Sequence, residues 1–149
     1  MSSPLEFWHH HGAMSVPDIE AAVVWWDRIL DFKLLKRFRI AAIPAEVAML
    51  QNGPLHIELF ELAAAKPLPP ERREPDTDLL THGNKHVSFA VHDVETFAQE
   101  LKRRGADIVW VRKMPHGSNI FIRDLAGNLI EFVAEPKPEA HMGLLKHAG

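Results

Sequence analysis

The chain has 149 residues, of which 46% are hydrophobic and 25% are charged, a composition typical of one globular domain with a real core. Its formal net charge of -3 provides no basic surface for nucleic acid, and the lack of cysteine excludes disulfides, thiolate nucleophiles and Cys-based metal sites. No apolar run is long enough to cross a bilayer, and the first residues lack a signal-peptide pattern. We therefore expect a cytoplasmic protein that binds neither nucleic acid nor membranes.

The first predicted elements are a strand, a helix and three further strands. The strand ends at Val16-Pro17, and Asp18 is the predicted N-cap of an amphipathic helix whose apolar residues recur at helical spacing to Leu30. Strands are then predicted over residues 33–40, 45–51 and 55–62. These elements form a first module, about residues 7–62.

Residues 63–83 are interpreted as a linker because Pro67, Pro69, Pro70 and Pro75 stand there among charged residues. We expect it to form neither a helix nor a central strand, although it could also cover a site as a lid. A second module, about residues 84–135, follows it within the same domain, and we assign no chemistry to the tail, residues 136–149.

The second module repeats the first. A strand is predicted over residues 86–91, a helix from the N-cap Asp93 to the closing Gly105, and strands over 107–113, 118–123 and 129–134. The repeat is visible in the sequence, because a set of residues in the first module recurs at one constant offset: His11, Val16, Asp18 and Glu20 match His86, Val91, Asp93 and Glu95. Glu58 and Glu131 correspond at a nearly equal offset.

Strand parity then predicts a metal site. Alternation of side chains places one His and one Glu of each module on a face otherwise lined by small residues. A carboxylate buried in the middle of a strand costs several kcal/mol unless it is paired or bound to a cation, and this chain repeats the arrangement. We therefore predict that one divalent ion (zinc, nickel, cobalt, manganese or iron) is held by His11, Glu58, His86 and Glu131.

The alternative for each of these residues alone is a structural or surface role, and it is the duplication that favours ligands. The other histidines lack such a counterpart and are interpreted as surface residues or as partners of the ligands. Arg39 and His116 are predicted to bind a polar group of the substrate.

Several of these motifs, in their order and spacing, resemble the vicinal oxygen chelate superfamily, which includes glyoxalase I, methylmalonyl-CoA epimerase, extradiol dioxygenases and antibiotic-resistance proteins. The resemblance spans roughly residues 7–135 and rests on five pieces: His11-x3-Ser15-Val16-Pro17-Asp18, the helix ending Trp25-Trp26-x3-Leu30-Asp31-Phe32, His56-Ile-Glu58-Leu, His86-x4-Val91 and Asp124-Leu-Ala-Gly127-Asn128-Leu-Ile-Glu131.

This resemblance implies an α+β fold in which two paired βαβββ modules form a cupped mixed sheet around one metal ion. A substrate would chelate the ion through two neighbouring oxygens, and the ligands carried over by position are the four residues already named. The chain departs from the common pattern at Leu125, where many members have Pro, and at Asp31, where many have Gly. Members are usually dimers, so we expect a homodimer, and whether one chain or two swapped chains form the site stays open.

The predicted activity is that of a metal-dependent epimerase or isomerase, with a lyase as a variant. A cation that binds adjacent substrate oxygens stabilises a metal-bound enediolate, so a proton can leave the carbon beside a carbonyl. Glu58 and Glu131 are the predicted catalytic bases, and the substrate is expected to be a hydroxyketone, a keto-sugar-like compound or an acyl thioester.

Two alternatives remain at this point. One is an iron-dependent extradiol-type ring-cleavage dioxygenase that uses His11, His86 and Glu131 as a facial triad. The other is a metal-free protein that binds a small molecule, like the resistance members of the superfamily.

Overall fold

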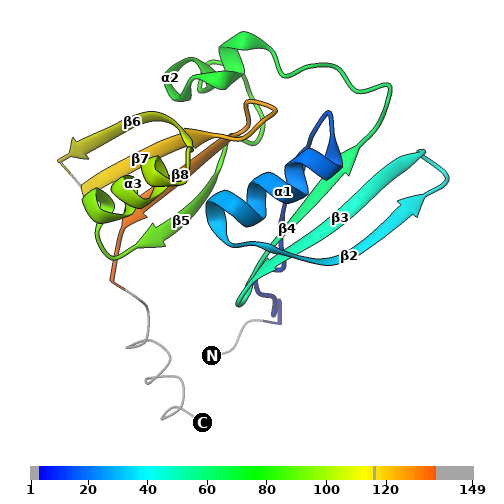
Figure 1. Cartoon of the computed structure of the whole chain (residues 1–149), viewed down its shortest axis with the longest axis horizontal. Coiled ribbons are helices and arrows are strands. Elements are labelled where there is room, and N and C mark those ends of the chain that lie inside the picture. The colour runs from blue at the N-terminus through cyan, green and yellow to red at the C-terminus, as the bar shows by residue number, and fades with distance from the viewer. Residues whose placement is uncertain (1–3, 116, 137–149) are drawn as a thin grey trace, which may run out of the picture. The chain divides into compact units, whose positions relative to one another are not determined.

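The computed structural model describes residues 4–115 and 117–136, and its elements follow the repeat (Figure 1). The first module contains β1 (Gly12–Ser15), α1 (Ile19–Leu30), β2 (Lys33–Ile40), β3 (Ala45–Asn52) and β4 (Leu55–Glu61). The second contains β5 (Val87–Val91), α3 (Val94–Arg103), β6 (Asp107–Met114), β7 (Gly117–Arg123) and β8 (Leu129–Ala134). The expected α+β class and paired βαβββ modules are confirmed.

Each module builds its own four-stranded mixed sheet. The strand order is β1-β4-β3-β2 in the first and β5-β8-β7-β6 in the second, and in both the opening strand runs parallel to the last one. The chain divides into two compact units, Met1–Pro67 and Leu68–Gly149, each of which holds one sheet. The topology therefore places the first strand of each module directly beside its last strand.

One helix covers one face of each sheet, as α1 and α3 show in Figure 1. Both predicted N-caps are confirmed: an Asp18 side-chain oxygen accepts a hydrogen bond from the Ala21 N–H at 3.0 Å, and Asp93 accepts one from Glu95 at 3.2 Å. Between helix and sheet lies the core, where each fully buried side chain contributes about 1.5–3 kcal/mol. Its most buried members include Trp26, Ile29, Leu50, Ile57, Leu59, Leu101, Ile120, Ile122 and Ile130.

The departure at Asp31 has a local explanation. Asp31 ends α1 in the left-handed conformation, with φ 56°, which is the conformation that a glycine adopts most readily at the end of a helix. Aspartate tolerates this conformation better than most residues, so the turn into β2 keeps its geometry.

The prediction that the linker contains no helix is wrong. A 3-10 helix, η1 (Pro70–Arg73), and one turn of α-helix, α2 (Pro75–Asp78), form in it. Pro70 and Pro75 stand at the first position of these short helices, where a missing N–H group costs no helical hydrogen bond. From Leu68 onward the linker belongs to the second unit.

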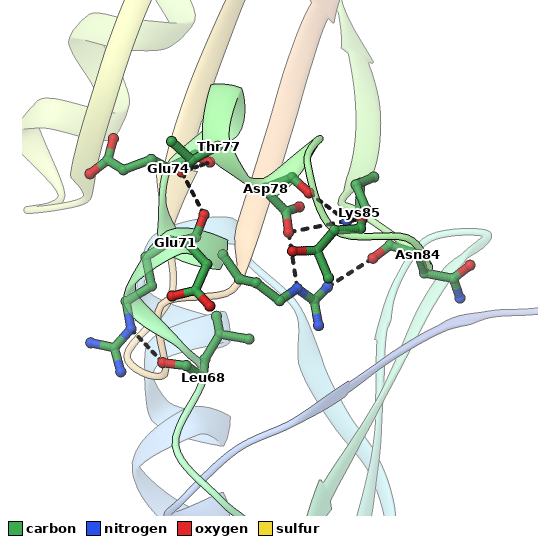
Figure 2. Close-up of polar contacts among 10 residues, drawn as sticks. Leu68, Glu71, Glu74, Thr77, Asp78, Asn84 and Lys85 are labelled. Carbon is green, nitrogen blue, oxygen red and sulfur yellow. Dashed lines mark hydrogen bonds and ion pairs between the residues drawn. The ribbon is translucent and has the colours of Figure 1, made fainter.

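A buried carboxylate fixes the linker to the second module (Figure 2). Asp78 is only 1% exposed, and its Oδ1 lies 2.9 Å from Arg72 Nε and 3.3 Å from Lys85 Nζ. Lys85 Nζ also donates to the Asp78 carbonyl at 2.6 Å, and Arg72 donates to the Asn84 carbonyl at 2.9 Å. These contacts join α2 to the segment that leads into β5. Within residues 4–115 and 117–136, no helix is long and apolar enough to cross a membrane.

Candidate metal centre

The first unit brings one predicted ligand pair together. His11 lies immediately before β1, and the register of β1 with β4 pairs Ala13 with Glu58. Because His11 and Ala13 have the same parity, the imidazole lies on the face that carries the carboxylate. His11 Nε2 is 3.5 Å from Glu58 Oε1, and the two side chains are 31% and 17% exposed.

The second unit repeats this arrangement with its own pair. His86 lies immediately before β5, and the register pairs Ser88 with Glu131. His86 Nε2 is 3.6 Å from Glu131 Oε1, with side-chain exposures of 26% and 17%. The two pairs thus have nearly the same spacing and burial.

This spacing fits two ligands of one ion better than a hydrogen bond. A donor and an acceptor 3.5–3.6 Å apart are beyond the usual range of an N–H···O bond. Two atoms that each lie about 2.0–2.1 Å from a tetrahedral ion are separated by about 3.4 Å. An imidazole nitrogen and a carboxylate oxygen also suit a borderline divalent metal. Each pair therefore has the chemistry and the separation of half a metal site.

The four-residue site itself stays a prediction. No group of three or more His, Asp or Glu residues that could hold a metal is found in the part of the chain that the structure describes. Among residues 4–115 and 117–136, each unit contributes one such His/Glu pair, and the two pairs belong to separate compact units.

A neighbouring histidine orients the first imidazole. His10 Nδ1 lies 2.6 Å from His11 Nδ1, so one ring donates to the other, and the His10 ring stacks on His56 at a centroid distance of 6.2 Å. When His11 Nδ1 carries the proton, its Nε2 lone pair faces Glu58 and is available to a cation. His10 has no repeat partner, so no signal in the sequence separates it from the other histidines.

Glu131 is held more extensively than a lone strand carboxylate. Its Oε1 accepts a hydrogen bond from Ser88 Oγ at 2.8 Å, and its Oε2 accepts one from Asn119 Nδ2 at 3.0 Å. Both oxygens are thereby oriented by neighbouring strands of the same sheet.

The predicted substrate-binding residues are not brought to these pairs. Arg39 lies 3.4 Å from Glu46, and the strand registers place both on the sheet face opposite Glu58, the face on which Glu61 accepts a hydrogen bond from Ile19 of α1. His116 lies outside the described residues. Substrate binding by either residue stays a prediction.

Another arginine shares a face with a ligand candidate. The register across β6, β7 and β8 places Trp110 and Arg112 on the face of Glu131, and the Arg112 guanidinium lies 3.5 Å from the centroid of the Trp110 ring. The pairing shifts between Ile108 and Trp110, and such an irregularity cannot be read from alternation in the sequence.

Comparison with known proteins agrees with this fold. The family model of the Glyoxalase/Bleomycin resistance protein/Dioxygenase superfamily matches residues 8–132. A 2-epi-5-epi-valiolone epimerase from an Actinomyces species is 28% identical over 142 residues, which cover 85% of this chain and 73% of the relative.

Solved structures show the same architecture. A glyoxalase family protein from Enterococcus faecalis superposes with a TM-score of 0.71 at 20% identity, covering 85% of this chain and 96% of that one. A variant of the fosfomycin resistance protein FosX from Listeria monocytogenes, solved with Mn(II) and 1S,2S-dihydroxypropylphosphonic acid, gives a TM-score of 0.64 at 14% identity, covering 92% and 99%. At these identities the likeness shows the fold alone.

Proposed function

Since the chain belongs to the Glyoxalase/Bleomycin resistance protein/Dioxygenase superfamily, we propose that it is a divalent-metal-dependent epimerase or isomerase that moves a proton beside a carbonyl group. The observation that carries this proposal is the repeated His/Glu pair, with Nε2 to Oε1 distances of 3.5 and 3.6 Å in two modules of the same topology. The resemblance inferred from the sequence is confirmed by the family match.

We propose His11, Glu58, His86 and Glu131 as the ligands of one zinc, nickel, cobalt, manganese or iron ion. When bound, such an ion supplies positive charge that stabilises the enediolate formed when a proton leaves the carbon beside a carbonyl. Residues of this chain perform the proton transfer itself. In this proposal His11 and His86 bind the ion. The carboxylates of Glu58 and Glu131 then lie on the sheet faces that we assign to the substrate.

Two carboxylates suit an epimerase in particular. Inversion at carbon requires a proton to leave one face of the substrate and another to arrive on the opposite face. Glu58 and Glu131 come from different modules, each 17% exposed at its side chain, so each keeps partial access to solvent and to a ligand. In this proposal one accepts the proton and the other returns one.

The epimerase relative supports epimerisation over the alternatives. Ring cleavage of the extradiol type needs only a triad of two His and one Glu, and it leaves the second repeated carboxylate without a role. The relative is named for 2-epi-5-epi-valiolone, and this compound is the first substrate to test. Other hydroxyketones, keto-sugar-like compounds and acyl thioesters follow.

The test is proton NMR in D2O with the purified protein and these compounds. Deuterium incorporation at the carbon beside the carbonyl, lost in Glu58→Gln and Glu131→Gln, is the expected result. A matched control is Glu71→Gln, an exposed carboxylate of the linker. Oxygen uptake with a catechol and no deuterium incorporation with any of these compounds would instead identify a dioxygenase.

A further inference from the structure

We propose that Ser88 and Asn119 are positioning residues that hold the Glu131 carboxylate in its ligand orientation, and that only the second module has this device. The inference rests on the proposed function in one respect, because it takes Glu131 to be a metal ligand. Its structural basis is independent of any activity.

The device is a chain of side-chain hydrogen bonds across the four strands β5, β8, β7 and β6. Ser88 Oγ donates to Glu131 Oε1 at 2.8 Å, and Asn119 Nδ2 donates to Glu131 Oε2 at 3.0 Å. Asn119 Oδ1 in turn accepts from Trp110 Nε1 at 3.2 Å. An indole N–H can only donate, so it fixes which end of the Asn119 amide points toward Glu131.

The Trp110 ring itself makes two further contacts. It meets Phe121 edge to face at a centroid distance of 5.3 Å, and the Arg112 guanidinium lies 3.5 Å from its centroid. Phe121 also meets the His86 ring edge to face at 4.8 Å. The same aromatic group therefore supports both the amide that orients Glu131 and the imidazole opposite it.

The first module has no side-chain hydrogen-bond donors at the equivalent positions. Ala13 pairs with Glu58 as Ser88 pairs with Glu131. Val47 pairs with Phe60, two positions after Glu58. In the same way, Asn119 pairs with Val133, two positions after Glu131. Alanine and valine side chains carry no donor, so the two carboxylates are held differently although the sheets share one topology.

The orientation leaves Glu131 able to bind a cation. A carboxylate oxygen has room for two partners, so Oε1 can accept from Ser88 and still direct a lone pair toward the space beside His86 Nε2, which is 3.6 Å away. A ligand that is held before binding loses less freedom when the metal arrives. We therefore expect the device to raise metal affinity.

The experiment replaces each donor by the residue that the first module uses, in Ser88→Ala and Asn119→Val. Titration calorimetry of the metal-free protein with Zn(II) and with Mn(II) measures the affinity. Loss of such a partner typically weakens metal binding by about 10- to 100-fold, and we expect this range for each variant. Ser88→Thr keeps the hydroxyl and should bind within about threefold of the wild type.

The matched control is Ser118→Ala. Ser118 is the neighbour of Asn119 in β7 but pairs with Lys113, whose ion pair with Glu95 of α3 places it on the helix side of the sheet. Its removal should leave the affinity unchanged. Ser88 is exposed, so Ser88→Ala should keep the denaturation midpoint of the metal-free protein, and the affinity loss is then not a loss of folding.

The outcomes are distinct. If the wild type binds metal and Ser88→Ala binds equally well, the positioning role is refuted while the proposed metal site stands. If Asn119→Val fails to fold, Ser88→Ala and its rescue by Ser88→Thr decide the question. A wild type that binds neither metal refutes both this inference and the proposed function.

Discussion

The buried carboxylate that fixes the linker gives the most quantitative prediction. Asp78→Ala removes the group that lies 2.9 Å from Arg72 Nε and 3.3 Å from Lys85 Nζ. Asp78 and Lys85 are labelled in Figure 2. Both cations then lose their carboxylate partner. Since Lys85 directly precedes His86, the substitution also loosens the segment that positions a proposed ligand.

The expected cost follows from the burial of the partners. Removing one member of a buried ion pair costs about 3–5 kcal/mol. Arg72 is 32% exposed at its side chain, so water screens part of its loss, and Lys85 keeps hydrogen bonds to the carbonyls of Asp78 and Thr81. We therefore expect a destabilisation near the lower limit, about 3 kcal/mol.

Hydrogen exchange measured by mass spectrometry can place this loss in one unit. A loss of about 3 kcal/mol speeds exchange of the globally protected amides of β5 to β8 by roughly 150-fold, whereas β1 to β4 should change little. The control is Asp76→Ala, whose carboxylate is 74% exposed and 4.0 Å from Arg112, with an expected change within about 0.5 kcal/mol. Equal exchange in the two variants would refute the role of the linker in the second unit.

Three further predictions concern the site and its supporting turns. His10→Phe keeps an aromatic ring but removes the contact to the neighbouring ligand histidine, so metal affinity by calorimetry should fall about tenfold, and an unchanged affinity would contradict the orienting role. Burial raises the pKa of the Asp124 carboxyl above its usual 3.8; its contribution to stability is fully present below pH 3.8 and is lost as the pH rises through the raised folded-state pKa. Asp124→Asn should remove this component from denaturation midpoints measured across that window, and an identical pH dependence in both proteins would rule it out. Gly127→Ala adds a Cβ at φ +89°, 3.0 Å from two side-chain carbons of Arg73, so it should cost about 1–3 kcal/mol and more than Gly105→Ala, where φ is +84° and nothing lies within 4 Å. Equal unfolding free energies of the two variants would show that the Arg73 side chain moves away from the new Cβ without a loss of stability.

Much of the fold was predictable because its signals are local and occur twice. Helical spacing after Asp18 and Asp93 and alternation in the strands gave element bounds within about two residues of those observed. The alternation of side chains along the strands also predicts that His11 shares a sheet face with Glu58, and that His86 shares one with Glu131. Here both the residues and their mutual placement follow from one strand pair.

What could not be predicted depends on contacts between distant segments. The short helices at Pro70 and Pro75 form where the linker packs through Asp78 onto Lys85, and proline content alone suggested an irregular chain. Asn119 reaches Glu131 only through a β6–β7 register that contains an irregularity. Arg39 lies beside Glu46 on the sheet face opposite Glu58, and the charge of a residue does not indicate which face it occupies, so substrate binding by Arg39 stays a prediction.

Two His/Glu pairs are proposed to hold one divalent ion, and the most direct test of this site is the binding stoichiometry of the metal-free protein measured by calorimetry, together with elemental analysis. We predict one ion per chain, with binding lost in His11→Ala and equally lost in His86→Ala, because the proposed site takes one His/Glu pair from each module. Retention of metal by His11→Ala, with loss only in His86→Ala, would contradict a shared site.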